Sequence, residues 1–236
     1  VYSNAPLKAD IKVVTTIQPL HSLVANGMDG TGNLGLILER SASPHNFSLK
    51  PSHAKMLEKA DVVFWFGEDL ETFLEKALKT IPTKAKIISF MKLKKIPKLK
   101  FREKNIFEHD EHKDEHKDEH KDGHDEHNHA HGEFDAHLWL DPINAKIILK
   151  EIAHVLSDVD PSNGKKYKEN ANKTSYKIDR MVADINKTIN KQARFITFHD
   201  AYQYFEKSFK VSSMGALTVN TDVQPGAKQV SEIQKH

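Results

Sequence analysis

Histidine is the residue type in this sequence best suited to chemistry, and it occurs in two settings. Three histidines stand where apolar runs give way to polar residues: His45 in SPHNFSLKPS, His137 in DAHLWLDP and His199 in ITFHDAY. Eight of the fifteen histidines instead lie in one run, residues 108–132, reading EHDEHKDEHKDEHKDGHDEHNHAHG. Neutral imidazoles are ligands that suit Zn²⁺, so both groups are candidate metal sites.

The three scattered histidines each flank an apolar run, and we expect them at transitions from strand to loop. Imidazoles that converge from sheet edges would form a nitrogen-rich pocket suited to Zn²⁺. Asp141 and Asp200 are nearby carboxylates that we expect to orient the rings. Taken singly, each histidine has the alternative of being an ordinary capping or surface residue.

The histidine-rich run repeats DEHK three times, at residues 110–113, 114–117 and 118–121. Its polar, charged composition predicts a solvated loop without fixed structure. Such a loop can still collect Zn²⁺, although more weakly than a preformed pocket, because binding must order it. We therefore expect auxiliary, low-affinity metal binding at His109, His112, His116, His120, His124, His127, His129 and His131.

The composition excludes several classes of protein. The chain of 236 residues has no cysteine, which rules out disulfides and thiolate metal sites. Its net charge is only +2 and no recognition motif accompanies its lysines, so nucleic-acid binding is not expected. No apolar run reaches the ~18–20 residues of a membrane span. The start, VYSNAPLKADIKVV, resembles a mature end after removal of a secretion signal. We expect a monomer in the periplasm, or an extracytoplasmic lipoprotein, peripheral to the membrane at most.

The first half of the chain alternates strand and helix patterns. This order predicts an α/β fold with a parallel sheet, helices on both faces, and ligands at the carboxyl ends of the strands. The fully apolar run DVVFWFG predicts a central, buried strand. The expected strands cover residues 11–17, 34–39, 61–67 and 85–90, and the clearest helices cover residues 51–60 and 69–81.

The second half is expected to contain a bridging helix and a smaller lobe. A helix at 142–158 is followed by a helical stretch at 161–193, which would be about 45–50 Å long. Strands are expected at 194–201 and 211–219. We therefore predict an N-terminal lobe at 1–160 with an insert at about 103–133, a linking helix at 161–193, and a C-terminal lobe at 194–236 that looks incomplete.

Four segments, in this order, resemble the zinc-specific solute-binding proteins of ABC importers, the periplasmic ZnuA-like family: SPHNFSLKPS, HLWLDP, FITFHDAYQYF and TVNTDVQPGA. The resemblance covers essentially the whole chain. It implies two α/β lobes joined by one long rigid helix, with metal in the cleft between them. It also implies that His45, His137 and His199 are the metal ligands, and members commonly carry a His-rich insert before HLWL.

The resemblance also bears on which metal is bound. Manganese-binding relatives tend to have a carboxylate at the position of His199, so a histidine there favours zinc. Some zinc members have a Glu where this chain has Pro44, so a water or a carboxylate of the second lobe must fill the fourth position. The family also usually continues beyond QPGAKQVSEI.

The function expected from these observations is extracytoplasmic binding of Zn²⁺, as a transported ligand, and its delivery to the permease of an ABC importer. The alternatives are a manganese-binding protein of the same superfamily, or a His-rich metal reservoir or adhesin-like protein. A zinc hydrolase would need Asp200 or Glu206 as its base. Since no HExxH motif is present, we expect no enzymatic activity.

Overall fold

The computed structural model describes residues 10–39, 44, 47–81, 84–102 and 133–218. A four-stranded sheet, in which every pair is parallel and the order is β2-β1-β3-β4, forms its larger part. The sheet reverses its winding between β1 and β3, the kind of crevice where ligands bind in such folds. The strands are β1 (Lys12–Thr15), β2 (Asn33–Leu36), β3 (Val62–Trp65) and β4 (Lys86–Ser89).

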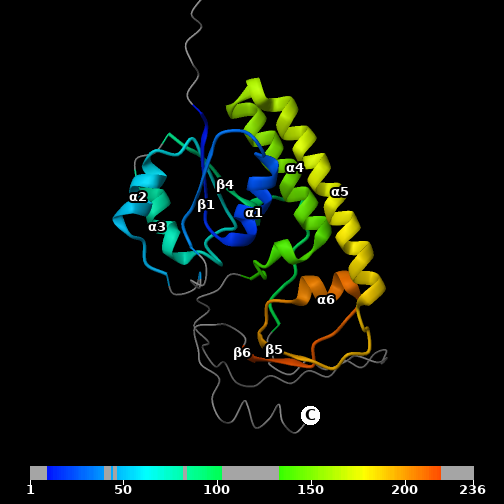
Figure 1. Ribbon diagram of the computed structural model, residues 1–236. Helices are drawn as coiled ribbons and strands as arrows, with labels where there is room; N and C mark the ends of the chain where they lie inside the picture. The colour runs from blue at the N-terminus through cyan, green and yellow to red at the C-terminus, as the bar shows by residue number, and fades with distance from the viewer. Residues whose placement is uncertain (1–9, 40–43, 45–46, 82–83, 103–132, 219–236) are drawn as a thin grey trace, which may run out of the picture.

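Helices cover both faces of this sheet (Figure 1). On one side lie α1 (Gln18–Gly27) and α4 (Pro142–Val159), and on the other lie α2 (Pro51–Glu58) and α3 (Thr72–Thr80). Because successive side chains of a strand point to opposite faces of the sheet, a strand can contribute buried residues to both helical layers.

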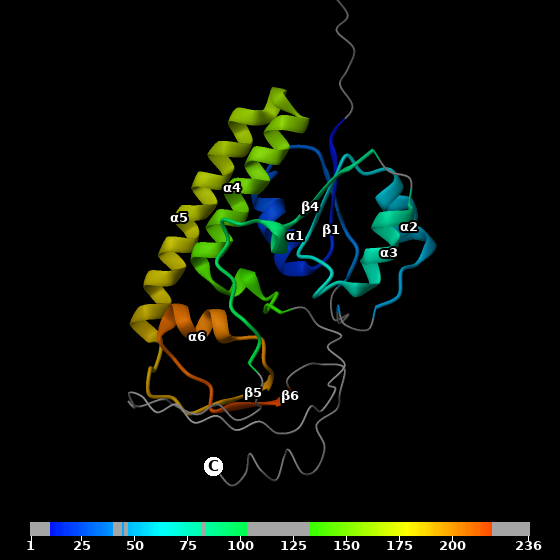
Figure 2. The same ribbon diagram turned by 180° about the vertical axis from the view of Figure 1, so that it is seen from behind.

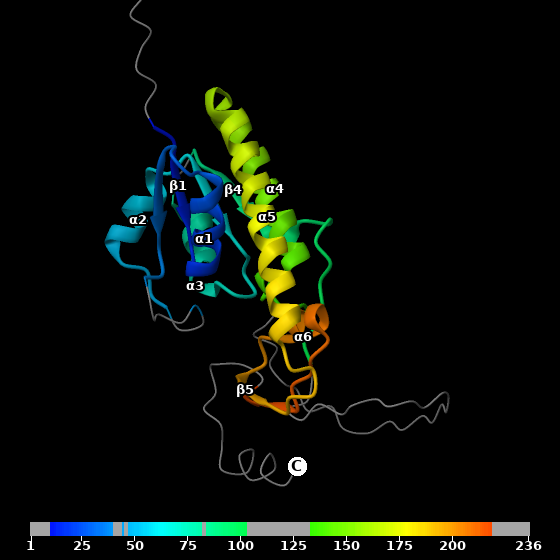
Figure 3. The same ribbon diagram turned by 45° about the vertical axis from the view of Figure 1, so that its right-hand side comes forward.

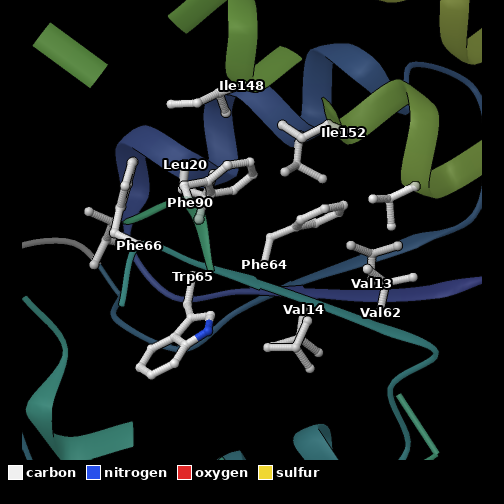
Figure 4. Packing of buried hydrophobic residues seen from close by; sticks show 14 of the residues in the cluster. Val13, Val14, Leu20, Val62, Phe64, Trp65, Phe66, Phe90, Ile148 and Ile152 are labelled. Atoms are coloured by element: carbon white, nitrogen blue, oxygen red, sulfur yellow. The ribbon is translucent and has the colours of Figure 1, made fainter. Parts of the chain in front are cut away.

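The core is built from alternating side chains of the strands (Figure 4). Phe64 and Val62 point toward α1 and α4, while Trp65 and Val14 point to the opposite face. All four residues of β3 are buried, which confirms the prediction of a central strand. The predicted α/β class with a parallel sheet flanked by helices is also confirmed, although each strand is shorter than the apolar run that predicts it.

The long helix α5 (Gly164–Thr188) packs along α4 and α1 and extends past the sheet (Figures 2 and 3). Its 25 residues correspond to about 37 Å, which is shorter than the stretch predicted at 161–193. Pro161–Asn163 forms a separate 3-10 turn before the helix. The helix ends at Thr188, where a second β-branched residue, Ile189, is already extended; such residues have low helix propensity.

Beyond α5 lies a second, smaller unit, here called the β5–β6 unit (residues 196–218). It consists of β5 (Ile196–His199), α6 (Gln203–Phe209) and β6 (Gly215–Thr218), and its two strands are parallel. In Figures 1 and 3 it lies at the end of α5 that is remote from the first turn of that helix.

A short antiparallel contact, here called the stem, joins the two ends of the segment 103–132. It consists of a bridge between Lys100 and Phe134 and a hydrogen bond of 2.8 Å from Asp135 N to Leu99 O. The His-rich run itself lies outside the described residues. Within the described ranges, no helix is both long and apolar enough to cross a membrane.

Candidate metal centre

His137 sits beside the carboxyl end of β3, held there by aromatic packing. It directly precedes a 3-10 turn, Leu138–Leu140, so the expected transition from strand to loop is not found at this histidine. The ring of Trp139 in that turn lies 4.8 Å from Phe66, the residue after β3, and 5.2 Å from the ring of His137, between centroids. A hydrophobic tryptophan contact therefore positions this histidine, which is only 8% exposed.

Asp135 orients the imidazole of His137. One of its carboxylate oxygens lies 2.6 Å from Nδ1 of His137 and accepts the backbone N–H of the same residue at 2.9 Å. The other oxygen accepts a hydrogen bond of 2.8 Å from Gln203 on α6. A carboxylate on Nδ1 fixes the proton there and leaves Nε2 as the nitrogen that can bind a metal.

His199, the last residue of β5, brings a second imidazole to the same place. The ring centroids of His137 and His199 are 5.4 Å apart, with an angle of 53° between the ring planes. Two imidazoles that share a tetrahedral Zn²⁺, with Zn–N bonds of about 2.0–2.1 Å, place their centroids about 5 Å apart. The two rings therefore have a separation compatible with one zinc ion between them.

The β5–β6 unit is fastened beside His137 through the stem. Tyr204 of α6 donates a hydrogen bond of 2.8 Å to the backbone oxygen of Asp135 and accepts one of 2.9 Å from Leu99 N. Arg102, two residues beyond the stem residue Lys100, binds both Asp200 and Glu206. The position of His199 relative to His137 thus depends on contacts that pass through the stem.

Of the two carboxylates singled out from the sequence, neither is the one found on His137. Asp141 caps the start of α4, where it accepts a hydrogen bond of 2.7 Å from Ile143 N. Asp200 follows His199 directly, and its carboxylate accepts hydrogen bonds from the guanidinium of Arg102. Asp135 was missed, although its place two residues before a histidine in FDAH was a usable signal.

A buried carboxylate also fastens the edge of the sheet on which the site lies. Glu71 is 0% exposed and accepts hydrogen bonds from Thr16, after β1, and from the backbone N–H groups of Phe66 and Gly67, after β3. Burial raises the pKa of Glu71 to about 7, against the opposing effect of these hydrogen bonds. The contacts tie together the two strand ends at the reversal of the sheet.

His45 and all eight histidines of the run lie outside the described residues. Of the three predicted ligands, the structure therefore places two, and it brings them together. Within the described ranges, no three residues of the types His, Cys, Asp and Glu form a group that could hold a metal ion.

Comparison with known proteins matches this chain to one family over almost its full length. The family model for the periplasmic zinc-uptake complex component A, ZnuA, matches residues 13–236. The high-affinity zinc uptake system protein ZnuA of Brucella abortus is 40% identical over 238 residues, covering 94% of this chain and 71% of that protein. The protein of the same name from Yersinia pestis is 32% identical over 229 residues, covering 96% of this chain and 71% of that protein.

Solved structures agree on the fold. A Zn(II)-bound mutant variant of AdcAII from Streptococcus pneumoniae superposes with a TM-score of 0.73 at 22% identity, covering 98% of this chain and 77% of that one. At that identity the likeness shows the architecture alone. The family match, the sequence identity to the curated relatives and this shared fold support one assignment: the chain belongs to the ZnuA family of periplasmic zinc-uptake components, as the resemblance of its motifs predicted.

Proposed function

We propose that this protein binds Zn²⁺ outside the cytoplasm and delivers it to the permease of an ABC importer. The observation that carries the proposal is the pair of imidazoles, His137 and His199, whose centroids lie 5.4 Å apart beside the reversal of the sheet. Asp135 orients one of them, as the carboxylate partners of zinc-binding histidines do. The family and the names of the relatives, zinc uptake proteins, support zinc as the cargo.

His45 would complete the set of three imidazoles. In the sequence it follows β2, whose carboxyl end lies at the same edge of the sheet as those of β1 and β3. A water or a carboxylate from the second lobe would occupy the fourth position of a tetrahedral site. No nucleophile or base is needed, because the cargo is bound and released without making or breaking a covalent bond.

The run 108–132 would act as an auxiliary collector or sensor of zinc. In the sequence the run lies between Arg102 and Asp135, and the residues that pair in the stem, Lys100 and Phe134, flank it on either side. Metal captured there at high concentration would thus be held close to the specific site. Because the collector has to be ordered when it binds, its affinity should be lower.

Calorimetric titration with Zn²⁺ tests the ligand set. The unmodified protein should bind about one zinc tightly. His45→Ala, His137→Ala and His199→Ala should each weaken zinc binding by at least ~100-fold, which is more than the loss expected when only the hydrogen-bond partner of a metal ligand is removed. His154→Ala is the matched control, because this histidine is exposed on α4. Unchanged tight binding after His199→Ala would contradict the proposed site.

Deletion of residues 108–132 separates the specific site from the collector. One tight zinc should remain, with the weaker binding lost; disappearance of the tight site would assign it to the run instead.

Competition between Zn²⁺ and Mn²⁺ on this variant distinguishes zinc from manganese as the cargo. Tight zinc should also be released near pH 5–6, where imidazoles ordinarily become protonated.

A further inference from the structure

Arg102 is the centre of a buried ionic cluster beside the candidate site. Its Nε lies 2.9 Å from Oδ2 of Asp200, its Nη1 lies 3.1 Å from Oε2 of Glu206, and its Nη2 lies 2.9 Å from Oε1 of Glu206. Asp200 and Glu206 are 2% and 8% exposed at their side chains, and Arg102 is 25% exposed. The guanidinium thus engages both oxygens of each carboxylate in a planar fork that lysine cannot reproduce.

This cluster connects the segments that carry His137 and His199, the two histidines of the candidate site. Arg102 lies two residues beyond the stem residue Lys100, and the other side of the stem leads through Asp135 to His137. Asp200 immediately follows His199 at the end of β5. Glu206 belongs to α6 and also accepts a hydrogen bond of 3.1 Å from Ser213 N, just before β6.

The carboxylate of Asp200 is a latent metal ligand. It is one residue from His199, and it lies near enough to Asp135, the partner of His137, for the two negative charges to interact. A carboxylate is a harder ligand than an imidazole and shifts a site from zinc toward Mn²⁺.

We propose that Arg102 is a positioning residue that sets the metal preference of the site, by holding the carboxylate of Asp200 away from the coordination sphere. The cargo then meets imidazole nitrogens, while the carboxylate that directly follows His199 is bound by a guanidinium. The inference rests on the proposed function, since it requires His137 and His199 to bind the metal. It assigns selectivity to a residue that acts through Asp200 and is not itself a metal ligand.

Two combined variants of the whole chain test the proposal. Arg102→Gln with Glu206→Gln removes the guanidinium and one buried charge, so the side chain of Asp200 is no longer held by Arg102. Adding Asp200→Asn gives the matched control, in which the same guanidinium is lost but no carboxylate is released. The measurement is the ratio of the Zn²⁺ and Mn²⁺ dissociation constants, obtained by competition at one equivalent of metal.

The double variant should shift this ratio toward manganese by about tenfold or more, because it gains a hard oxygen ligand. The triple variant should keep the preference of the unmodified protein. Equal ratios in the double and triple variants, or an unshifted ratio in the double variant, would overturn the proposal, because loss of structure alone would affect both alike. Tight zinc binding that survives His199→Ala would instead refute the proposed function.

Circular dichroism first establishes that both variants are folded. If the double variant is not folded, Arg102→Lys with and without Asp200→Asn takes its place, since lysine keeps the charge but not the fork. A shift toward manganese in Arg102→Lys that Asp200→Asn abolishes supports the proposal. Equal ratios in that pair overturn it.

Discussion

The four-stranded sheet and the β5–β6 unit are stabilised by different forces. Val62, Val63 and Phe64 of β3 are each 0% exposed, whereas Ile196 and Phe198 of β5 are 43% and 61% exposed. The β5–β6 unit is joined to the rest of the molecule by the hydrogen bonds of Tyr204, which also belongs to the buried hydrophobic cluster, and by the ion pairs of Arg102. His137 therefore lies on a densely packed body, and His199 lies on a smaller unit that hydrogen bonds and ion pairs help to position.

The buried carboxylates of the two regions differ in the same way. Glu71, at the edge of the sheet, accepts its hydrogen bonds from a hydroxyl and two backbone N–H groups, and burial raises its pKa to about 7. Asp200 and Glu206 share the guanidinium of Arg102. A proton can stabilise the first carboxylate, while a fixed cation stabilises the other two. The two regions should therefore respond differently to mutation and to pH.

Shortening an apolar side chain should have the largest effect on stability, and only in the packed body. Phe64→Ala should lower the free energy of unfolding by about 3–5 kcal/mol, because it opens a cavity at the centre of the sheet. Phe198→Ala is the counterpart in β5 and should change it by about 0.5 kcal/mol or less. Urea denaturation measures both, and similar losses would contradict the contrast in packing.

Removing the charge of Glu71 should change how stability depends on pH. With a folded pKa of about 7 and an ordinary value of 4.5, Glu71 binds more protons folded than unfolded between these values. Its contribution is therefore fully present below pH 4.5 and is lost as the pH rises through 7. Relative to Glu71→Gln, the unmodified protein should lose about 3 kcal/mol between pH 4.5 and 8. Parallel stability curves for the two proteins would contradict this pKa.

Removing one acid from the Arg102 cluster should loosen the β5–β6 unit alone. Glu206→Ala should cost roughly 2 kcal/mol, less than for a fully buried pair because Arg102 is partly exposed. Amide hydrogen exchange should accelerate in β6 and α6 but not in β3. Glu169→Ala breaks an exposed pair with Lys165 and should have almost no effect. Equal acceleration throughout the molecule would show that the two regions are not independently stabilised.

Hydrophobic patterning was sufficient to predict the sheet. DVVFWFG is apolar throughout because β3 is covered on both faces, and the alternation of strands and helices leaves few topologies. The ends of elements were less predictable. Whether a helix continues past Thr188 depends on the balance of weak local propensities and packing, which the periodicity of the apolar residues does not report.

Residue types pointed to the candidate site, but its supporting contacts could not be predicted from the sequence. His137 and His199 were recognisable from their motifs, whereas the surroundings of each depend on residues distant in sequence. The fork between Arg102 and Asp200 joins positions 98 residues apart. The packing of Trp139 on Phe66 is likewise tertiary, and it explains why His137 occupies the sheet edge without belonging to a strand.

The smallest expected effect on zinc binding distinguishes Asp135 from Asp141 as the carboxylate that supports the candidate metal site. Asp135→Asn should weaken zinc binding by about 10–100-fold, because the carboxylate on Nδ1 makes His137 a better ligand through Nε2. An amide at this position can also offer an N–H to Nδ1, which favours the tautomer with the proton on Nε2 and blocks the metal. Asp141→Asn is the control, since asparagine caps a helix as well as aspartate does. Calorimetric titration with Zn²⁺ compares the two variants. If Asp141→Asn weakened zinc binding and Asp135→Asn did not, Asp141 rather than Asp135 would be the carboxylate that orients His137.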